Sequence, residues 1–158
     1  AREVLDVLPA LATDLDNIEL RSSMARAALF AGLAFSNTKT AIAQSLSYPI
    51  TLRHGVPHGI ACSFSLPLVI DSVRGIGGLC EASLSRIFDG KLDRASGRMA
   101  QLLGHLGVSA DPAAFGVQDY EWAAMVSNAF DGERGKNFIG DKQRFMKAAE
   151  ALRAAAAE

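Results

Sequence analysis

Apolar residues recur at intervals of three and four positions along almost the whole chain. This period places side chains on one face of an α-helix, whereas the alternating runs that are typical of strands are nearly absent. The sequence therefore predicts an all-α fold, a bundle-like helical domain. Its 158 residues, 49% of them hydrophobic and 21% charged, are enough for one domain with a sizeable core. We expect residues 1–158 to form this single domain.

Capping residues and prolines predict where the helices begin and end. Asp16 or Asn17 can cap a helix that continues to about Leu33. Pro49 predicts the end of the next helix, and Pro67 predicts a kink or break in the one after it. The predicted helices cover approximately 2–8 with a kinked extension past position 9, 17–33, 38–48, a segment from 57 with its break at 67, 79–88, 92–106, 119–129 and 141 to the Ala-rich end.

Charge and cysteine content exclude several classes of protein. The formal net charge is −1 and no Lys/Arg tract is present, so neither nucleic acid nor an anionic membrane surface is an expected partner. The longest apolar stretch is too short to span a bilayer and contains Pro67. Cys62 and Cys80 lie in no paired motif and are expected to be reduced thiols of a cytoplasmic protein.

Polar residues that could form a site are concentrated between positions 35 and 59. Gln44 and Tyr48 are four apart and share one helix face, and the chain can return to place His58 opposite them. Residue types alone favour a modest interpretation, because a histidine at a helix start usually caps the helix or lies on the surface. Without further information the trio defines only a helical domain with a polar cleft.

Two longer motifs carry a family resemblance. The run AGLAFSNT at 31–38, followed by GVPHGIAC at 55–62 and Leu66-Pro67, resembles the catalytic helical domain of the iron-containing (group III) alcohol dehydrogenases, which have a dehydroquinate-synthase-like fold. The resemblance implies an N-terminal domain that binds NAD or NADP and precedes this chain. We therefore expect the chain to be the C-terminal part of a longer cytoplasmic homodimer, and to be inactive alone.

The same resemblance implies a metal site and its ligands. A divalent metal, Fe or Zn, would be held in part by His58 and by the residue at position 44, where the family's histidine is replaced by Gln44. Tyr48 stands where the family often has another histidine. Because an amide is a weaker ligand than imidazole, a metal-free alternative is also open, in which Tyr48 polarises the carbonyl or relays a proton.

The implied substrate is a small aldehyde or alcohol. The sequence Ser-Tyr-Pro at 47–49 resembles the branch that interconverts phosphonoacetaldehyde and hydroxyethylphosphonate. Candidate groups for binding the phosphonate are Lys39, Arg53, Arg134 and Lys136. The alternative for positions 133–137 is a solvated loop, and the alternative for the whole chain is a non-catalytic helical module for binding or dimerisation.

Overall fold

The computed structural model describes the backbone of residues 1–156 and the side chains of residues 1–151. This part of the chain is helical and contains no strand, which confirms the predicted all-α fold. Three short 3₁₀ turns lie at Leu92–Arg94, Pro112–Phe115 and Gly135–Asn137. The α-helices are α1 (Arg2–Thr13), α2 (Ile18–Phe35), α3 (Ile42–His54), α4 (His58–Ser63), α5 (Leu66–Val73), α6 (Gly78–Ile87), α7 (Ala95–His105), α8 (Asp119–Asp131) and α9 (Lys142–Ala156).

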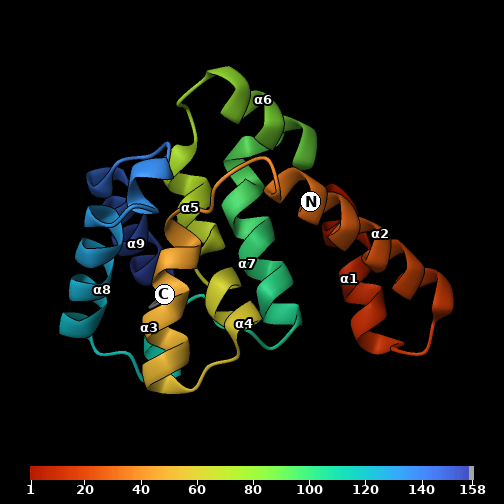
Figure 1. Ribbon diagram of the computed structural model, residues 1–158, viewed down its shortest axis with the longest axis horizontal. Helices are drawn as coiled ribbons and strands as arrows, with labels where there is room; N and C mark the ends of the chain where they lie inside the picture. Colours follow the sequence, from red (N-terminus) through yellow and green to blue (C-terminus); the bar gives the residue numbers. More distant parts are fainter. Residues whose placement is uncertain (157–158) are drawn as a thin grey trace.

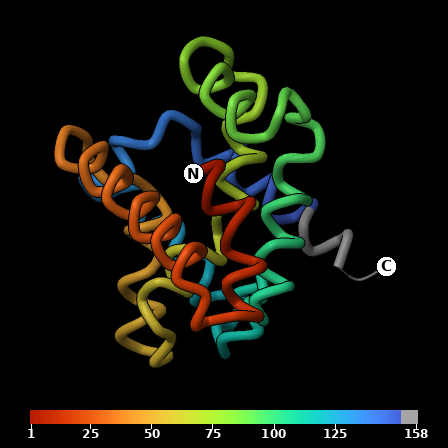
Figure 2. The backbone as a smooth tube through the Cα atoms, turned by 90° about the vertical axis from the view of Figure 1, so that its right-hand side faces the viewer, coloured from red at the N-terminus to blue at the C-terminus, as the bar shows by residue number. Residues whose placement is uncertain are grey.

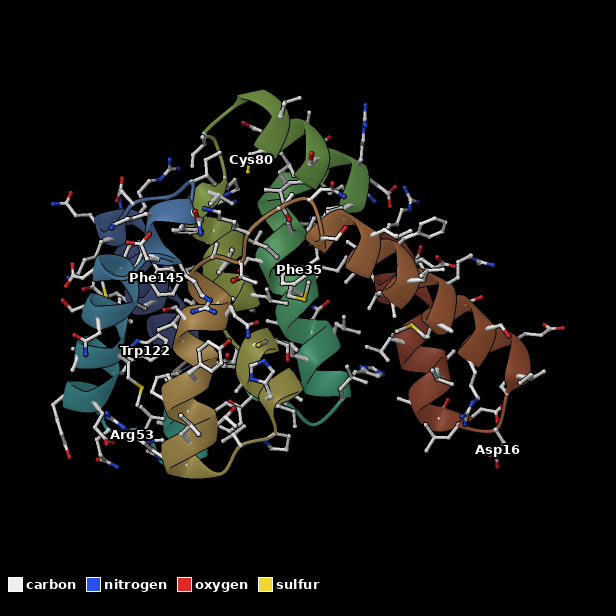
Figure 3. All side chains as sticks on the ribbon, in the orientation of Figure 1. Asp16, Phe35, Arg53, Cys80, Trp122 and Phe145 are labelled. Carbon is white, nitrogen blue, oxygen red and sulfur yellow. The ribbon has the colours of Figure 1, made fainter. Side chains whose placement is uncertain are left out.

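The helices are arranged around two apolar cores. Figure 1 shows α8 and α9 on one side of α3, and the hairpin of α1 and α2 at the opposite end of the molecule. The larger core joins α3, α4, α5, α8 and α9, and Figure 3 shows Trp122 and Phe145 pointing into it. The smaller core joins α1, α5, the end of α6 and α7 around Leu5, Ile70, Phe88 and Ala95. Helix α5 contributes to both cores and connects them.

Most predicted boundaries are confirmed. Asn17 caps α2 by accepting a hydrogen bond from the Leu20 N–H at 3.1 Å. Pro9 lies inside α1, as the predicted extension required. The predicted break is also present: α4 ends before Phe64, and Pro67 lies in the first turn of α5, where no intrahelical N–H is needed.

The predicted helix at 38–48 is wrong at both ends. The observed α3 begins at Ile42 and continues through Pro49 to His54. Ile42, Leu46 and Ile50 form one fully buried stripe at intervals of four residues. The stripe continues past the proline, so its packing outweighs the one backbone hydrogen bond that Pro49 removes. The connection to α4 is therefore shorter than the predicted polar segment.

Helix α2 leaves a broad apolar surface exposed. Only Ala27 of this 18-residue helix is buried. Leu29, Phe30 and Leu33 lie within one turn of each other and are 56–62% exposed. No helix of the described residues is long and apolar enough to cross a membrane. We call this exposed surface, formed by Leu29, Phe30 and Leu33, the α2 patch. It is the kind of surface that proteins bury against a partner.

Gly135 provides a test of the loop after α8. It is buried, and a Cβ there would overlap the carbonyl oxygens of Ala129 and Phe130. Because these are backbone atoms that cannot move aside easily, we expect Gly135→Ala to lower the free energy of unfolding by about 2 kcal/mol. The free energy of unfolding of the variant and of the wild type is measured by urea unfolding, with circular dichroism as the signal.

The matched control is Gly97→Ala in α7, where a Cβ meets nothing within 4 Å. This variant should keep the free energy of unfolding or raise it by up to about 1 kcal/mol, because alanine favours helix. Equal effects of the two substitutions would contradict the structure around Gly135.

Candidate functional site

The structure brings together the three polar residues that the spacing placed in one cleft. The Gln44 amide Nε2 lies 3.0 Å from the His58 Nε2 and donates to the Tyr48 hydroxyl at 3.2 Å. The rings of Tyr48 and His58 have centroids 5.7 Å apart. Gln44 is half-buried, whereas Tyr48 and His58 are exposed. The convergence of α3 and α4 predicted from the sequence is therefore present.

Cys62 belongs to the same cluster, which the sequence interpretation did not include. It lies one turn after His58 on α4, and its Sγ is 3.5 Å from the His58 Nε2. The thiol also donates to the Gln44 Oε1 at 3.4 Å. The spacing of four residues between His58 and Cys62 was the available signal. Gln44, Tyr48, His58 and Cys62 are called the α3–α4 polar cluster below.

Arg134 is the one predicted basic residue that contacts this cluster. It extends from the loop after α8, where its Nε donates to the Thr40 Oγ1 at 3.0 Å and its Nη2 to the Tyr48 hydroxyl at 3.4 Å. The guanidinium carbon lies 5.0 Å from the centre of the Tyr48 ring. Asn137 holds the same loop by donating to the Thr40 carbonyl at 3.1 Å. Within residues 1–151 Arg134 has no carboxylate partner, so its charge is not neutralised there.

The other basic candidates lie elsewhere. Lys136 pairs with Glu133 at 2.5 Å, and Lys39 lies close enough to act on the same carboxylate. Arg53 lines a separate hollow of about 390 Å³ with Pro49 and Tyr120. Figure 3 shows Arg53 toward the lower end of α3, beside α8. The structure thus supports Arg134 as a neighbour of Tyr48 and leaves the role of the other three untested.

The direction of the hydrogen bonds at Tyr48 is chemically informative. Its oxygen accepts from both Gln44 and Arg134, and its own O–H is donated to no side chain or backbone group of the described residues. The hydroxyl is part of a side chain that is 40% exposed. Its proton is therefore available to a molecule that enters from solvent.

Comparison with known proteins places this chain in a family. Residues 1–130 match the profile of the Fe-containing alcohol dehydrogenase family, C-terminal. The chain therefore belongs to this family and corresponds to its C-terminal helical domain. A similar protein is the NAD-dependent methanol dehydrogenase of Bacillus methanolicus, with 24% identity over 135 residues. The match covers 80% of this chain but 35% of that protein, and no solved structure matches significantly.

The family description implies iron, and the relative's name implies NAD. At the positions expected to bind metal the structure places one imidazole and one amide, and an amide N–H points at the imidazole nitrogen that a metal would need. Among the described residues no three His, Cys, Asp or Glu side chains gather to hold a metal. These residues do not fit an iron site of imidazole and carboxylate donors. The described helices also contain no strand–loop–helix unit for a dinucleotide.

Glu133 gives a pH-dependent test of the loop that carries Arg134. The hydrogen bond from Lys136 and the positive charge of Lys136 lower the pKa of Glu133, and Lys39 adds a smaller effect. A lowered carboxyl pKa means that the interaction is complete above the ordinary glutamate pKa and is lost as pH falls through the folded-state value. We expect Lys136→Gln to raise the pKa of Glu133 toward its ordinary value, measured by carboxyl ¹³C NMR.

The control is Lys142→Gln, because Lys142 donates to the Ser127 hydroxyl on α8 and not to Glu133. This variant should leave the Glu133 titration unchanged. A Glu133 pKa that does not respond to the loss of Lys136 would show that the pair is absent in solution.

Proposed function

We propose that this chain is the C-terminal helical domain of an NAD(P)-dependent alcohol dehydrogenase that interconverts a small aldehyde and its alcohol. The observation that carries the proposal is the Tyr48 hydroxyl, which is held by two donors and has its proton free. Family membership and the name of the Bacillus relative support it. The chain spans about a third of that relative, so the activity and the cytoplasmic location of the whole protein are parts of the proposal.

Tyr48 is the proposed proton donor to the substrate oxygen. NAD(P)H, when bound by the preceding domain, supplies the hydride that turns the aldehyde into an alkoxide. The oxygen then takes the Tyr48 proton, and the phenol oxygen that remains keeps the Gln44 N–H and the Arg134 cation beside it. Both interactions strengthen as negative charge develops on that oxygen, which is how fixed donors assist proton transfer.

The proposed substrate carries an anionic group, and phosphonoacetaldehyde is the specific candidate. Arg134 uses two of its five N–H donors on Thr40 and Tyr48. The remaining donors, together with a charge that no described carboxylate neutralises, suit two oxygens of a phosphonate. Because Arg134 also contacts the Tyr48 hydroxyl, an anion bound there would bring the aldehyde of a two-carbon substrate close to Tyr48.

Substitution of Arg134 in the full-length protein tests the substrate class. Loss of one charge-assisted contact to a phosphonate is worth about 1.5–3 kcal/mol, so we expect Arg134→Gln to lower kcat/KM for phosphonoacetaldehyde by about 10-fold to 100-fold. For propionaldehyde the loss should be smaller, about 10-fold or less, since only the contact to the Tyr48 oxygen is removed. The measurement is steady-state oxidation of NADH and NADPH with both aldehydes.

Arg53→Gln is the matched control, because Arg53 lines a hollow separate from Tyr48. It should leave kcat/KM for both aldehydes unchanged. An equal loss on the two aldehydes in Arg134→Gln would overturn the anionic substrate, and activity that survives in Tyr48→Phe would overturn the role of Tyr48.

Association of two copies is a second candidate function, with or without catalysis. The α2 patch favours it, because three large apolar side chains are exposed side by side. We expect the full-length protein to be a homodimer and the double variant Phe30→Glu/Leu33→Glu to be monomeric in light scattering. Leu79→Glu on α6 is the control, since Leu79 is 88% exposed outside the patch, and it should remain dimeric. A monomeric wild-type protein would contradict this role.

A further inference from the structure

A hollow of about 390 Å³ lies between α3 and α8, separate from the α3–α4 polar cluster. The two helices run in opposite directions (Figure 1), and Asn137, shortly after α8, donates to the Thr40 carbonyl just before α3. The last turn of α3 therefore lies beside the first turn of α8. One face of α3 and one face of α8 line the hollow with residues that include Ser45, Pro49, Arg53, Glu121, Met125 and Asn128.

Two opposite charges line one end of this hollow without pairing. Arg53 is in the last turn of α3, and Glu121 is in the first turn of α8. Within residues 1–151 neither side chain forms an ion pair, with each other or with any other group. Glu121 uses one carboxylate oxygen to accept the Gln118 N–H at 3.1 Å, which leaves its other oxygen for a further donor. Arg53 is exposed and Glu121 half-buried, so a small molecule can reach both from solvent.

The rest of the hollow carries no charge. Pro49 and the buried Met125 line its middle with apolar surface. Ser45 lies two turns before Arg53 on α3, about 12 Å along the helix axis, and Asn128 lines the same far end from α8. Because Pro49 has no N–H, the Ser45 carbonyl lacks the donor that an α-helix normally supplies. The far end thus offers an unpaired backbone acceptor beside two polar side chains.

This distribution of groups selects a class of ligand. A simple anion on Arg53 would lie beside the Glu121 carboxylate, and a simple cation on Glu121 would lie beside the Arg53 guanidinium. A zwitterion satisfies both charges at once. In an α-amino acid the ammonium and carboxylate are on one carbon, at one end of an otherwise uncharged molecule, which matches the hollow from its charged end to its polar end.

We propose that the hollow between α3 and α8 binds a free α-amino acid with a linear side chain that ends in a polar group, of which L-glutamine is the probe. Arg53 donates to the carboxylate, and Glu121 accepts from the ammonium group. The methylene groups lie against Pro49 and Met125, and the terminal amide donates to the Ser45 carbonyl.

This inference goes beyond the proposed function and does not depend on it. Arg53 and Glu121 lie outside the α3–α4 polar cluster, and binding is measured without an aldehyde or a nucleotide. A protein that reduces aldehydes but binds no amino acid keeps the proposed function and loses this inference. A protein that binds L-glutamine but reduces no aldehyde does the opposite.

Calorimetric titration of the full-length protein with three related compounds tests the zwitterion. L-Glutamine has both charges, N-acetyl-L-glutamine lacks the ammonium, and L-glutamine α-amide lacks the carboxylate. We expect L-glutamine to bind and each of the other two to bind about 10-fold or more weakly, because each loses one charge-assisted contact. No saturable binding of L-glutamine at millimolar concentration, or equal binding of all three compounds, would overturn the proposal.

Two variants locate the binding in this hollow. Arg53→Gln and Glu121→Gln should each weaken L-glutamine binding by about 10-fold or more. Gln at position 121 can still accept the Gln118 N–H, so the start of α8 is kept. The matched controls are Arg86→Gln, an exposed arginine on α6, and Glu19→Gln, an exposed glutamate in the first turn of α2, and both should bind like the wild type.

The variants and the compounds together test which charge meets which. Acetylation of the ammonium should cost affinity in the wild type but little in Glu121→Gln, and conversion of the carboxylate to an amide should cost affinity in the wild type but little in Arg53→Gln. Full losses in both variants, or L-glutamine binding that neither variant changes, would show that the amino acid does not bind between Arg53 and Glu121.

Discussion

The turn between α3 and α4 depends on one left-handed residue. Gly55 caps α3 with φ 68°, a conformation that residues with a Cβ adopt only at a cost. A Cβ at this position would meet no atom within 4 Å, so glycine is required for its backbone angle and not for space. The reversal at Gly55 sends α4 back along α3 and places His58 against Gln44. Without it the two halves of the site would belong to separate parts of the surface.

Helix α5 follows α4 in the chain and packs in both apolar cores, which supports the turn between α3 and α4. Leu68 faces the core under α3 and α8, and Ile70, two residues later, faces the core under α1 and α7. Residues two apart on a helix lie about 200° around its axis, so one short helix can serve two cores. Ser96 of α7 adds a buried hydrogen bond to the Pro67 carbonyl at the start of α5. Leu5 of α1 packs in the smaller core as well, so this core joins the α1–α2 hairpin to α5 (Figure 2).

Local sequence rules predicted the fold well where they acted alone, and failed where tertiary packing opposed them. The cap at Asn17 and the break before Pro67 follow from single residues. Pro49 is different, because the buried stripe on α3 continues past it and only the packed structure shows which effect is larger. At the site, the meeting of Gln44 and His58 was predictable from spacing. The contact of Arg134 with Tyr48 joins residues 86 positions apart, and no local pattern encodes it.

The polar cluster is built from two pairs with the same spacing, Gln44 and Tyr48 on α3 and His58 and Cys62 on α4. Each pair occupies one helical turn, and only the three residues 55–57 separate the helices. Each residue added to a helix, or deleted from it, rotates all later side chains of that helix by about 100°. A substitution at any of the four positions therefore keeps the two helices in register, whereas an insertion within either turn would separate its pair.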